Sequence, residues 1–198
     1  YRGEDASAYE EAFDQETDKD DENYEPLTKF LAFINNSDDA TFAADLDEYL
    51  DVESFARYLA FQDLIDNFDD ISGPGNNSYL RYDEETGQMT VVAWDHNLAF
   101  GGLGGFGQAP GGPAGMPGGA FTLPEGFDPT QAPEGFGPPV GGGRGAFGRS
   151  NILVSRFEST EQLAAVYDEA TEELRAELFT SGKAQRILDR WVEVLKAH

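Results

Sequence analysis

The pattern of the chain changes from helical to extended within residues 64–100, whose sequence is LIDNFDDISGPGNNSYLRYDEETGQMTVVAWDHNLAF. The segment Asp69–Asn77 is composed mainly of Asp, Asn, Ser, Gly and Pro, which is typical of a loop. Residues 78–82 and 89–94 are rich in β-branched and aromatic residues, and a connection ending in Gly, residues 83–87, joins them. We therefore predict a loop followed by an antiparallel β-hairpin.

On both sides of this segment, apolar residues recur at the three- and four-residue spacing of amphipathic helices. Asp51 is placed to cap one of these helices, and Ser159 with Gln162 has the pattern of a capping box. Trp94 and Trp191 are large apolar side chains that we expect in the core. The expected fold is α+β and mainly α, with helices around the hairpin over residues 24–36, 40–48, 52–66, 159–179 and 183–196.

Two segments differ from the rest in composition. Residues 1–23 are polar and acidic, and we interpret them as a weakly ordered lead-in. Residues 101–148 hold 18 of the 23 Gly and 8 of the 10 Pro, which disfavours regular structure because Gly loses the most backbone entropy and Pro donates no hydrogen bond. The helical pattern resumes at Asn151. We expect one helical domain over 24–198, interrupted by a flexible Gly/Pro-rich insert at 101–148.

The net charge of −25 is extreme for 198 residues. It disfavours binding to nucleic acid and to anionic membrane surfaces, because their recognition begins with basic side chains. A solvated surface suited to high salt, cation binding and a basic partner all remain open as explanations. No apolar run approaches the roughly 18 residues of a membrane span. The chain contains no Cys, which excludes disulfides, thiolate zinc sites and cysteine nucleophiles.

Because His96 and His198 are the only imidazoles, any chemistry has to use carboxylates, amides and a hard metal ion such as Mg²⁺. Asp69 lies in the loop, Asn77 precedes the first strand, and Asp95 follows the second strand. A hairpin brings the start of its first strand close to the end of its second, so these three side chains can meet. The alternative is purely structural, because Asp and Asn also stabilise turns by bonding to the nearby backbone.

The order of motifs in this region resembles the signature of the CotH family of atypical, secreted-protein kinases. That signature runs Asn-x-Asp, a short loop, Asn-Tyr-x-Leu-Tyr, a Thr-Gly turn, Pro-Trp-Asp-x-Asp and an aromatic residue with Gly. The matching segments here are Asn67-Phe68-Asp69, residues 77–83, Thr86-Gly87 and residues 94–101. Similarity to the family extends over residues 31–64 and 151–195, so it covers nearly the whole chain outside the insert.

The resemblance implies the helical lobe of a kinase-like fold, and phosphorylation of a protein substrate with ATP and Mg²⁺ or Mn²⁺, in the manner of spore-coat kinases. Asp69 would be the catalytic-loop aspartate, with Asp70 as its rival. At the second Asp of Trp-Asp-x-Asp, this chain has Asn97. The metal ligands would be Asn77 or its neighbour Asn76, together with Asp95 and Asn97.

The family's nucleotide-holding half, with its phosphate loop and lysine, is expected upstream of Tyr1, because the chain has no initiator Met and none of its four Lys has a strand-like context. We expect this segment alone to bind metal weakly and to transfer no phosphate. Two other classes stay open: an inactive pseudokinase or coat or cell-surface assembly protein, and a calcium-dependent binding module. The resemblance also implies that the whole protein is secreted or located at the cell surface, although this chain contains no signal peptide.

Overall fold

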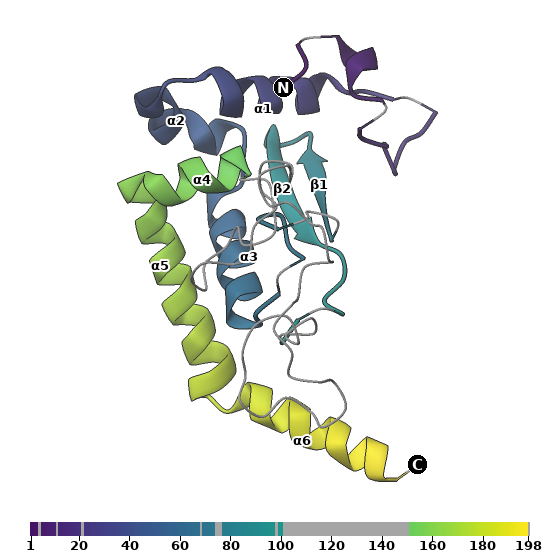
Figure 1. The fold of residues 1–198 in the computed structure, drawn as a ribbon, viewed down its shortest axis with the longest axis vertical. Helices are drawn as coiled ribbons and strands as arrows, with labels where there is room; N and C mark the ends of the chain where they lie inside the picture. The colour runs from purple at the N-terminus through teal and green to yellow at the C-terminus, as the bar shows by residue number, and fades with distance from the viewer. Residues whose placement is uncertain are drawn as a thin grey trace, which may run out of the picture.

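The computed structural model describes residues 1–100 and 151–197, apart from residues 4, 11, 21, 68, 74–76 and 98. In this part of the chain, most of the helices lie to one side of a two-stranded antiparallel sheet (Figure 1). The expected α+β, mainly α fold is therefore confirmed. The predicted Gly/Pro-rich insert at 101–148 lies outside the described residues.

The first half of the chain supplies α1, Glu25–Asn36, α2, Asp39–Asp45, the 3-10 helix η2, Leu46–Glu48, and α3, Val52–Leu64. Asp51 caps α3 as predicted, because its side chain accepts a hydrogen bond of 3.0 Å from the Ser54 N–H. Asp38 caps α2 in the same way through the Thr41 N–H at 2.9 Å. These caps satisfy backbone donors that the first turn of a helix leaves unpaired.

The hairpin consists of β1, Ser78–Asp83, and β2, Gln88–Ala93, which pair in antiparallel register. Side chains alternate between its two faces. Met89 and Val91 are buried in the same hydrophobic cluster as residues of α3, so this inner face belongs to the core. The outer face carries Tyr79, which is 45% exposed. The hairpin thus packs on α3 with one face and leaves the other accessible.

The second half of the chain forms α4, Ile152–Ser159, α5, Glu161–Arg175, the π-helical turn η4, Ala176–Thr180, and α6, Lys183–Lys196. The predicted capping box at Ser159 and Gln162 is wrong. Thr160 precedes α5 without a side-chain cap, and the Ser159 hydroxyl donates to the Arg156 carbonyl. Ser159 ends α4 instead of starting α5, because its hydroxyl finds an acceptor one turn back in its own helix.

The core is built around α3, which lies beside the hairpin, α4 and α5 (Figure 1). Phe55 of α3 packs edge-to-face against Phe157 of α4, with ring centroids 5.1 Å apart, and both side chains are fully buried. The Tyr167 hydroxyl of α5 also donates to Asp63 of α3. Because α3 is packed on several sides, its C-terminal end is a fixed support for the loop that follows.

Two tryptophans that we expected in the core are exposed instead. Trp94 is 70% exposed just after β2, and Trp191 is 60% exposed in α6. The helix α6 extends beyond the end of α5, and none of its residues is buried (Figure 1). Periodicity shows that a helix has an apolar face, but it does not show whether another part of the chain covers that face.

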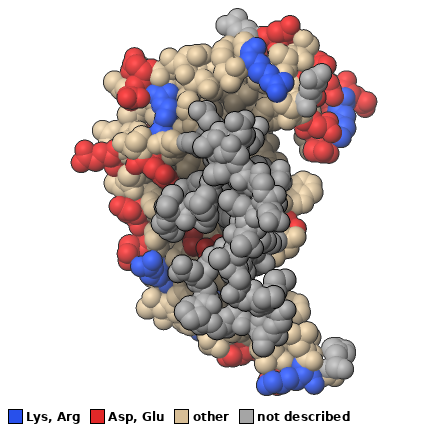
Figure 2. Space-filling view, viewed as in Figure 1, with Lys and Arg blue, Asp and Glu red and all other residues tan. Residues whose placement is uncertain are grey.

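The N-terminal residues 1–23 include the short 3-10 helix η1, Ala6–Ala8, and a buried Tyr9. The Tyr9 hydroxyl donates to the Gly3 carbonyl at 2.8 Å and accepts from the Arg2 N–H at 2.8 Å. Acidic side chains gather around this segment and beside α5 (Figure 2). None of the helices in the described part of the chain is long and apolar enough to cross a membrane.

Candidate functional site

The loop after α3 is anchored at three points. The Phe100 N–H donates to the Ile65 carbonyl at 2.6 Å, where α3 ends. The Ile71 N–H donates to the Tyr58 hydroxyl of α3 at 3.1 Å. The Asn151 side chain, at the start of α4, donates to the Ile71 carbonyl at 3.2 Å. Segments that are far apart in the sequence therefore hold the loop in place.

The structure brings Asp69 and Asn77 together. The side-chain amide of Asn77 donates to Asp69 Oδ2 at 2.7 Å. Asp69 is only 8% exposed, and its Oδ1 is buried with no hydrogen-bond partner in the described part of the chain. A buried carboxylate oxygen without a partner raises the free energy of the protein. A ligand proton or a cation at this atom would therefore lower that free energy.

Asp70, the rival of Asp69, has a different environment. It is 4% exposed, and its Oδ1 accepts hydrogen bonds from the Ser72 N–H at 2.9 Å and the Gly73 N–H at 3.0 Å. This is the arrangement in which an aspartate stabilises a turn. The geometry thus favours a structural role for Asp70. Asn76, the rival of Asn77, lies outside the described residues.

The hairpin brings Asp95 to the same end as Asn77. The Trp94 N–H donates to the Asn77 carbonyl at 2.9 Å, which continues the ladder beyond the strands. Asp95 follows directly and is half-buried, and its Oδ1 accepts from the Asn97 N–H at 2.8 Å. Asn97 itself is exposed. Among the described residues, no hydrogen bond joins the Asp95 carboxylate to the side chain of Asp69 or Asn77.

Two further features of the site are missing from the sequence-based prediction. Gln62 of α3 is 1% exposed and contacts both Asn67 and His96. Tyr79 and Trp94 form an exposed pair, with ring centroids 5.8 Å apart and an interplanar angle of 83°. The signal that could have identified Gln62 is its position as a polar residue in a helix that is apolar on most of its faces. No comparable signal indicates that Trp94 is exposed.

The available ligand atoms fit a hard cation. Asp69, Asn77 and Asp95 offer the carboxylate and amide oxygens that Mg²⁺ prefers. Asn77 uses its amide nitrogen for Asp69, which leaves its Oδ1 for a cation. In the described ranges, no group of three or more His, Cys, Asp and Glu residues could hold a metal ion. A cation here would therefore take additional oxygens from water or from a phosphate ligand, as Mg²⁺ commonly does.

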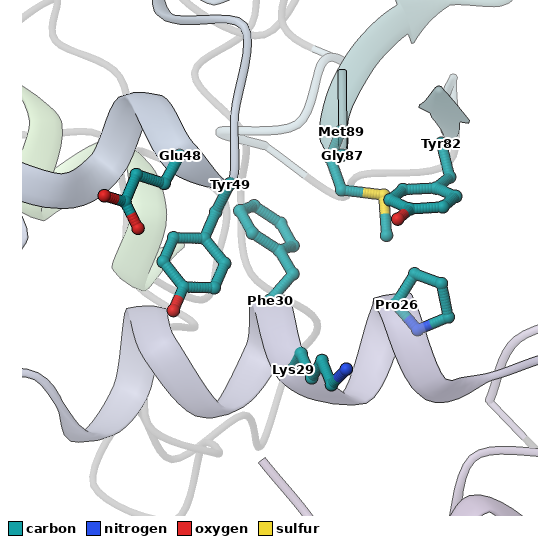
Figure 3. A pocket seen from close by; sticks show the side chains of 8 residues that line it. All are labelled: Pro26, Lys29, Phe30, Glu48, Tyr49, Tyr82, Gly87 and Met89. Atoms are coloured by element: carbon teal, nitrogen blue, oxygen red, sulfur yellow. The ribbon is translucent and has the colours of Figure 1, made fainter. Parts of the chain in front are cut away.

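A small hollow at the opposite end of the hairpin does not fit this chemistry (Figure 3). Its volume is about 90 Å³, below the roughly 300 Å³ at which small-molecule sites begin. The hydrogen bond and ion pair with Glu25 raise the pKa of Lys29, so this lysine is already engaged. The lining residues are Pro26, Lys29, Phe30, Glu48, Tyr49, Tyr82, Gly87 and Met89.

These features define a mainly helical α+β protein with carboxylate and amide side chains where a buried loop meets the open end of a β-hairpin. A family model described as CotH kinase protein matches residues 1–198. The chain therefore belongs to the CotH kinase family, and this family suggests the use of a nucleotide and a metal ion. No curated protein and no solved structure matches the chain.

Proposed function

We propose that the chain carries the catalytic-loop and metal-binding part of an ATP- and Mg²⁺-dependent protein kinase. The observation that carries this proposal is the 2.7 Å hydrogen bond from Asn77 to Asp69, together with the buried Asp69 Oδ1, which has no partner among the described residues. Protein kinases use an aspartate that accepts the proton of the substrate hydroxyl, and an asparagine and a second aspartate that bind metal. Membership of the CotH kinase family supports the same assignment.

Each of the three polar side chains has a separate task in this proposal. Asp69 Oδ1 accepts the proton of the substrate hydroxyl while the hydroxyl oxygen bonds to the γ-phosphorus and the bond to the bridging oxygen of ADP breaks. Asn77 Oδ1 and the Asp95 carboxylate would hold Mg²⁺, which would neutralise phosphate charge. The Asn77 amide nitrogen holds Asp69 Oδ2 and so fixes the direction of Oδ1.

The outer face of the hairpin supports a planar ligand beside these residues. Tyr79 and Trp94 are exposed on it, and Val92 lies opposite Tyr79 in the register. Exposed aromatic rings next to a charged site provide the surface on which a nucleotide base stacks. Because Trp94 immediately precedes Asp95, a base stacked there would bring its phosphates toward the metal ligands.

Calorimetric titration with Mg²⁺, Mn²⁺ and Ca²⁺, with and without ATP, tests the proposal. We expect weak binding of Mg²⁺ or Mn²⁺ alone and tighter binding with ATP, because phosphate oxygens complete the coordination. Asp69→Asn and Asp95→Asn should each weaken the ATP-dependent binding by about tenfold or more. Asp168→Asn, on the exposed side of α5, is the matched control and should have no effect. Binding that prefers Ca²⁺ and ignores both ATP and Asp95→Asn would instead identify a calcium-dependent module.

An inactive member of the family is the second candidate, and residue 97 favours it. Asn97 stands where the family signature has its second Asp, and its backbone N–H occupies Asp95 Oδ1. Such a protein would bind ATP with a metal ion but transfer no phosphate. Transfer of labelled phosphate from ATP to an acceptor protein separates the two candidates. Transfer that Asp69→Asn abolishes would identify an active kinase, whereas ATP-dependent metal binding without any transfer would identify the inactive member.

A further inference from the structure

Gln62 connects the two segments that carry the carboxylates of the candidate site. Its Oε1 accepts a hydrogen bond from the Asn67 side-chain amide at 2.7 Å, and its Nε2 lies 3.2 Å from His96 Nε2. Asn67 comes two residues before Asp69, and His96 directly follows Asp95. One side chain of α3, only 1% exposed, therefore contacts both the loop after α3 and the turn after β2.

The donor and acceptor roles in the contacts Asn67–Gln62 and Gln62–His96 depend on each other. Because Asn67 donates to Gln62 Oε1, the Gln62 NH₂ group is the donor toward His96, whose Nε2 accepts. Asn67 is itself 6% exposed. Phe61 packs edge-to-face on the His96 ring, with centroids 5.5 Å apart. Packing and hydrogen bonding thus hold both partners of Gln62 in place.

A buried amide in the last turn of a core helix is unfavourable unless its polar atoms are paired. The amide oxygen and the amide nitrogen of Gln62 are both paired. Their partners belong to the two segments whose carboxylates have to act on one ligand. The inference rests on the function proposed above, in which Asp69 and Asp95 serve the same phosphate transfer. In such a site, a displacement of about 1 Å lowers the rate by roughly a hundredfold. We propose that Gln62 is the positioning residue that sets the placement of the Asp69 loop relative to the Asp95 turn.

Two variants separate the contributions of the two hydrogen bonds. Gln62→Met keeps an unbranched side chain of similar size and removes both bonds. Gln62→Glu keeps an oxygen for the Asn67 amide but can only accept from His96, so that contact persists only if His96 Nε2 becomes the donor. The matched control is Gln88→Met near the turn of the hairpin, where Gln88 Nε2 donates to the Asp47 carbonyl at 2.6 Å.

The first measurement uses backbone amide resonances of the ¹⁵N-labelled chain and requires no ligand. Gln62→Met should displace resonances of both segments, 69–73 and 95–97, whereas Gln88→Met should displace neither. Gln62→Glu should displace mainly those of 95–97. If Gln62→Met shifts the resonances of only one segment, or of neither, the proposal is overturned. If Gln62→Met does not fold, unchanged resonances at 95–97 in Gln62→Glu overturn it.

The second measurement is Mn²⁺ affinity in the presence of ATP. Gln62→Met should lower this affinity about 10- to 100-fold, which is the usual effect of losing a residue that orients metal ligands. Unchanged affinity in a folded variant would show that Gln62 serves the fold alone and would overturn the positioning role. If the wild-type chain binds no Mn²⁺ with ATP, the proposed function fails, and the resonance measurement still decides whether Gln62 couples the two segments.

Discussion

The side chain of Asn77 donates a 2.7 Å hydrogen bond to Asp69, eight residues earlier in the chain. Asn77 stands directly before β1, whereas Asp69 belongs to the loop after α3, so this bond joins the hairpin and the loop into one unit. It also distinguishes two adjacent aspartates, because Asp70 instead accepts from the loop backbone. The consequences for stability and binding can be measured separately.

Replacing this amide by a carboxylate should destabilise the protein in a pH-dependent manner. Asn77→Asp would place two carboxylates face to face and should lower the free energy of unfolding by about 1–3 kcal/mol at neutral pH. Part of this loss should be recovered near about pH 4, because one proton shared between the carboxylates restores a hydrogen bond. Urea unfolding at both pH values measures the effect. Asn23→Asp at an exposed position is the control, and an Asn77→Asp loss that does not vary with pH would contradict the prediction.

The N-cap of α2 should make stability depend on pH. The hydrogen bond from the Thr41 N–H lowers the pKa of Asp38 below its ordinary value of 3.8. Since folding lowers this pKa, the contribution of Asp38 is complete above the unfolded value and is lost as the pH falls through the folded value. Asp38→Asn keeps a capping acceptor but does not ionise. The urea midpoint of the wild type should therefore fall more steeply than that of Asp38→Asn below about pH 4; parallel curves would refute this.

Arg156 of α4 holds the corner between α1 and α2. Its guanidinium donates to the Ile34 and Ser37 carbonyls at 3.0 and 2.9 Å, and lies 4.1 Å from the centre of the Phe42 ring. Arg156→Lys should lower the free energy of unfolding by about 1–3 kcal/mol, because an ammonium group cannot reproduce this planar set of contacts. Asp39→Asn, which removes only the charge of a fully exposed partner at 3.2 Å, should leave it almost unchanged. Equal losses in the two variants would argue against this assignment.

The contact between α3 and α4 should dominate the stability of the core. Phe157 is fully buried against Phe55, so Phe157→Ala should lower the free energy of unfolding by about 3–5 kcal/mol. The same truncation at Phe179, which is 46% exposed, should have an effect of about 1 kcal/mol or less. Thermal or urea unfolding measures both variants. A Phe157→Ala effect as small as that of Phe179→Ala would show that α4 is not part of the cooperative core.

Local patterns located most of the regular elements. The predicted helices over 24–36 and 183–196 agree with α1 and α6 to within one residue. The predicted helix over 52–66 is two residues longer than α3, because Ile65 leaves the helix and Asp66 adopts a φ of 50°. Periodicity and caps act over a few residues, so they locate an element well but its last turn less well.

The sequence limited the candidate site to a few residues. The surrounding structure was needed to tell their individual roles apart. Asp69 and Asp70 have the same chemistry and adjacent positions, and they differ in their partners: a side-chain amide for Asp69 and backbone N–H groups for Asp70. Gln62 lies in a helix before the segment that contains the recognisable motifs. Its importance follows from two partners, Asn67 and His96, that the fold places on either side of it.

By itself, the sequence located the hairpin and most of the helices, although the predicted ranges do not include α4. It also indicated the Asp51 cap, the family, and the segment that carries the carboxylates and amides. Only the tertiary structure decided that one Asp69 oxygen lacks a partner within the described residues, and that Trp94 and Trp191 are exposed. The physical reason is the range of the interactions. Helices and hairpins form through residues a few positions apart, whereas the burial of a side chain and the identity of its hydrogen-bond partner depend on segments that meet from distant parts of the chain.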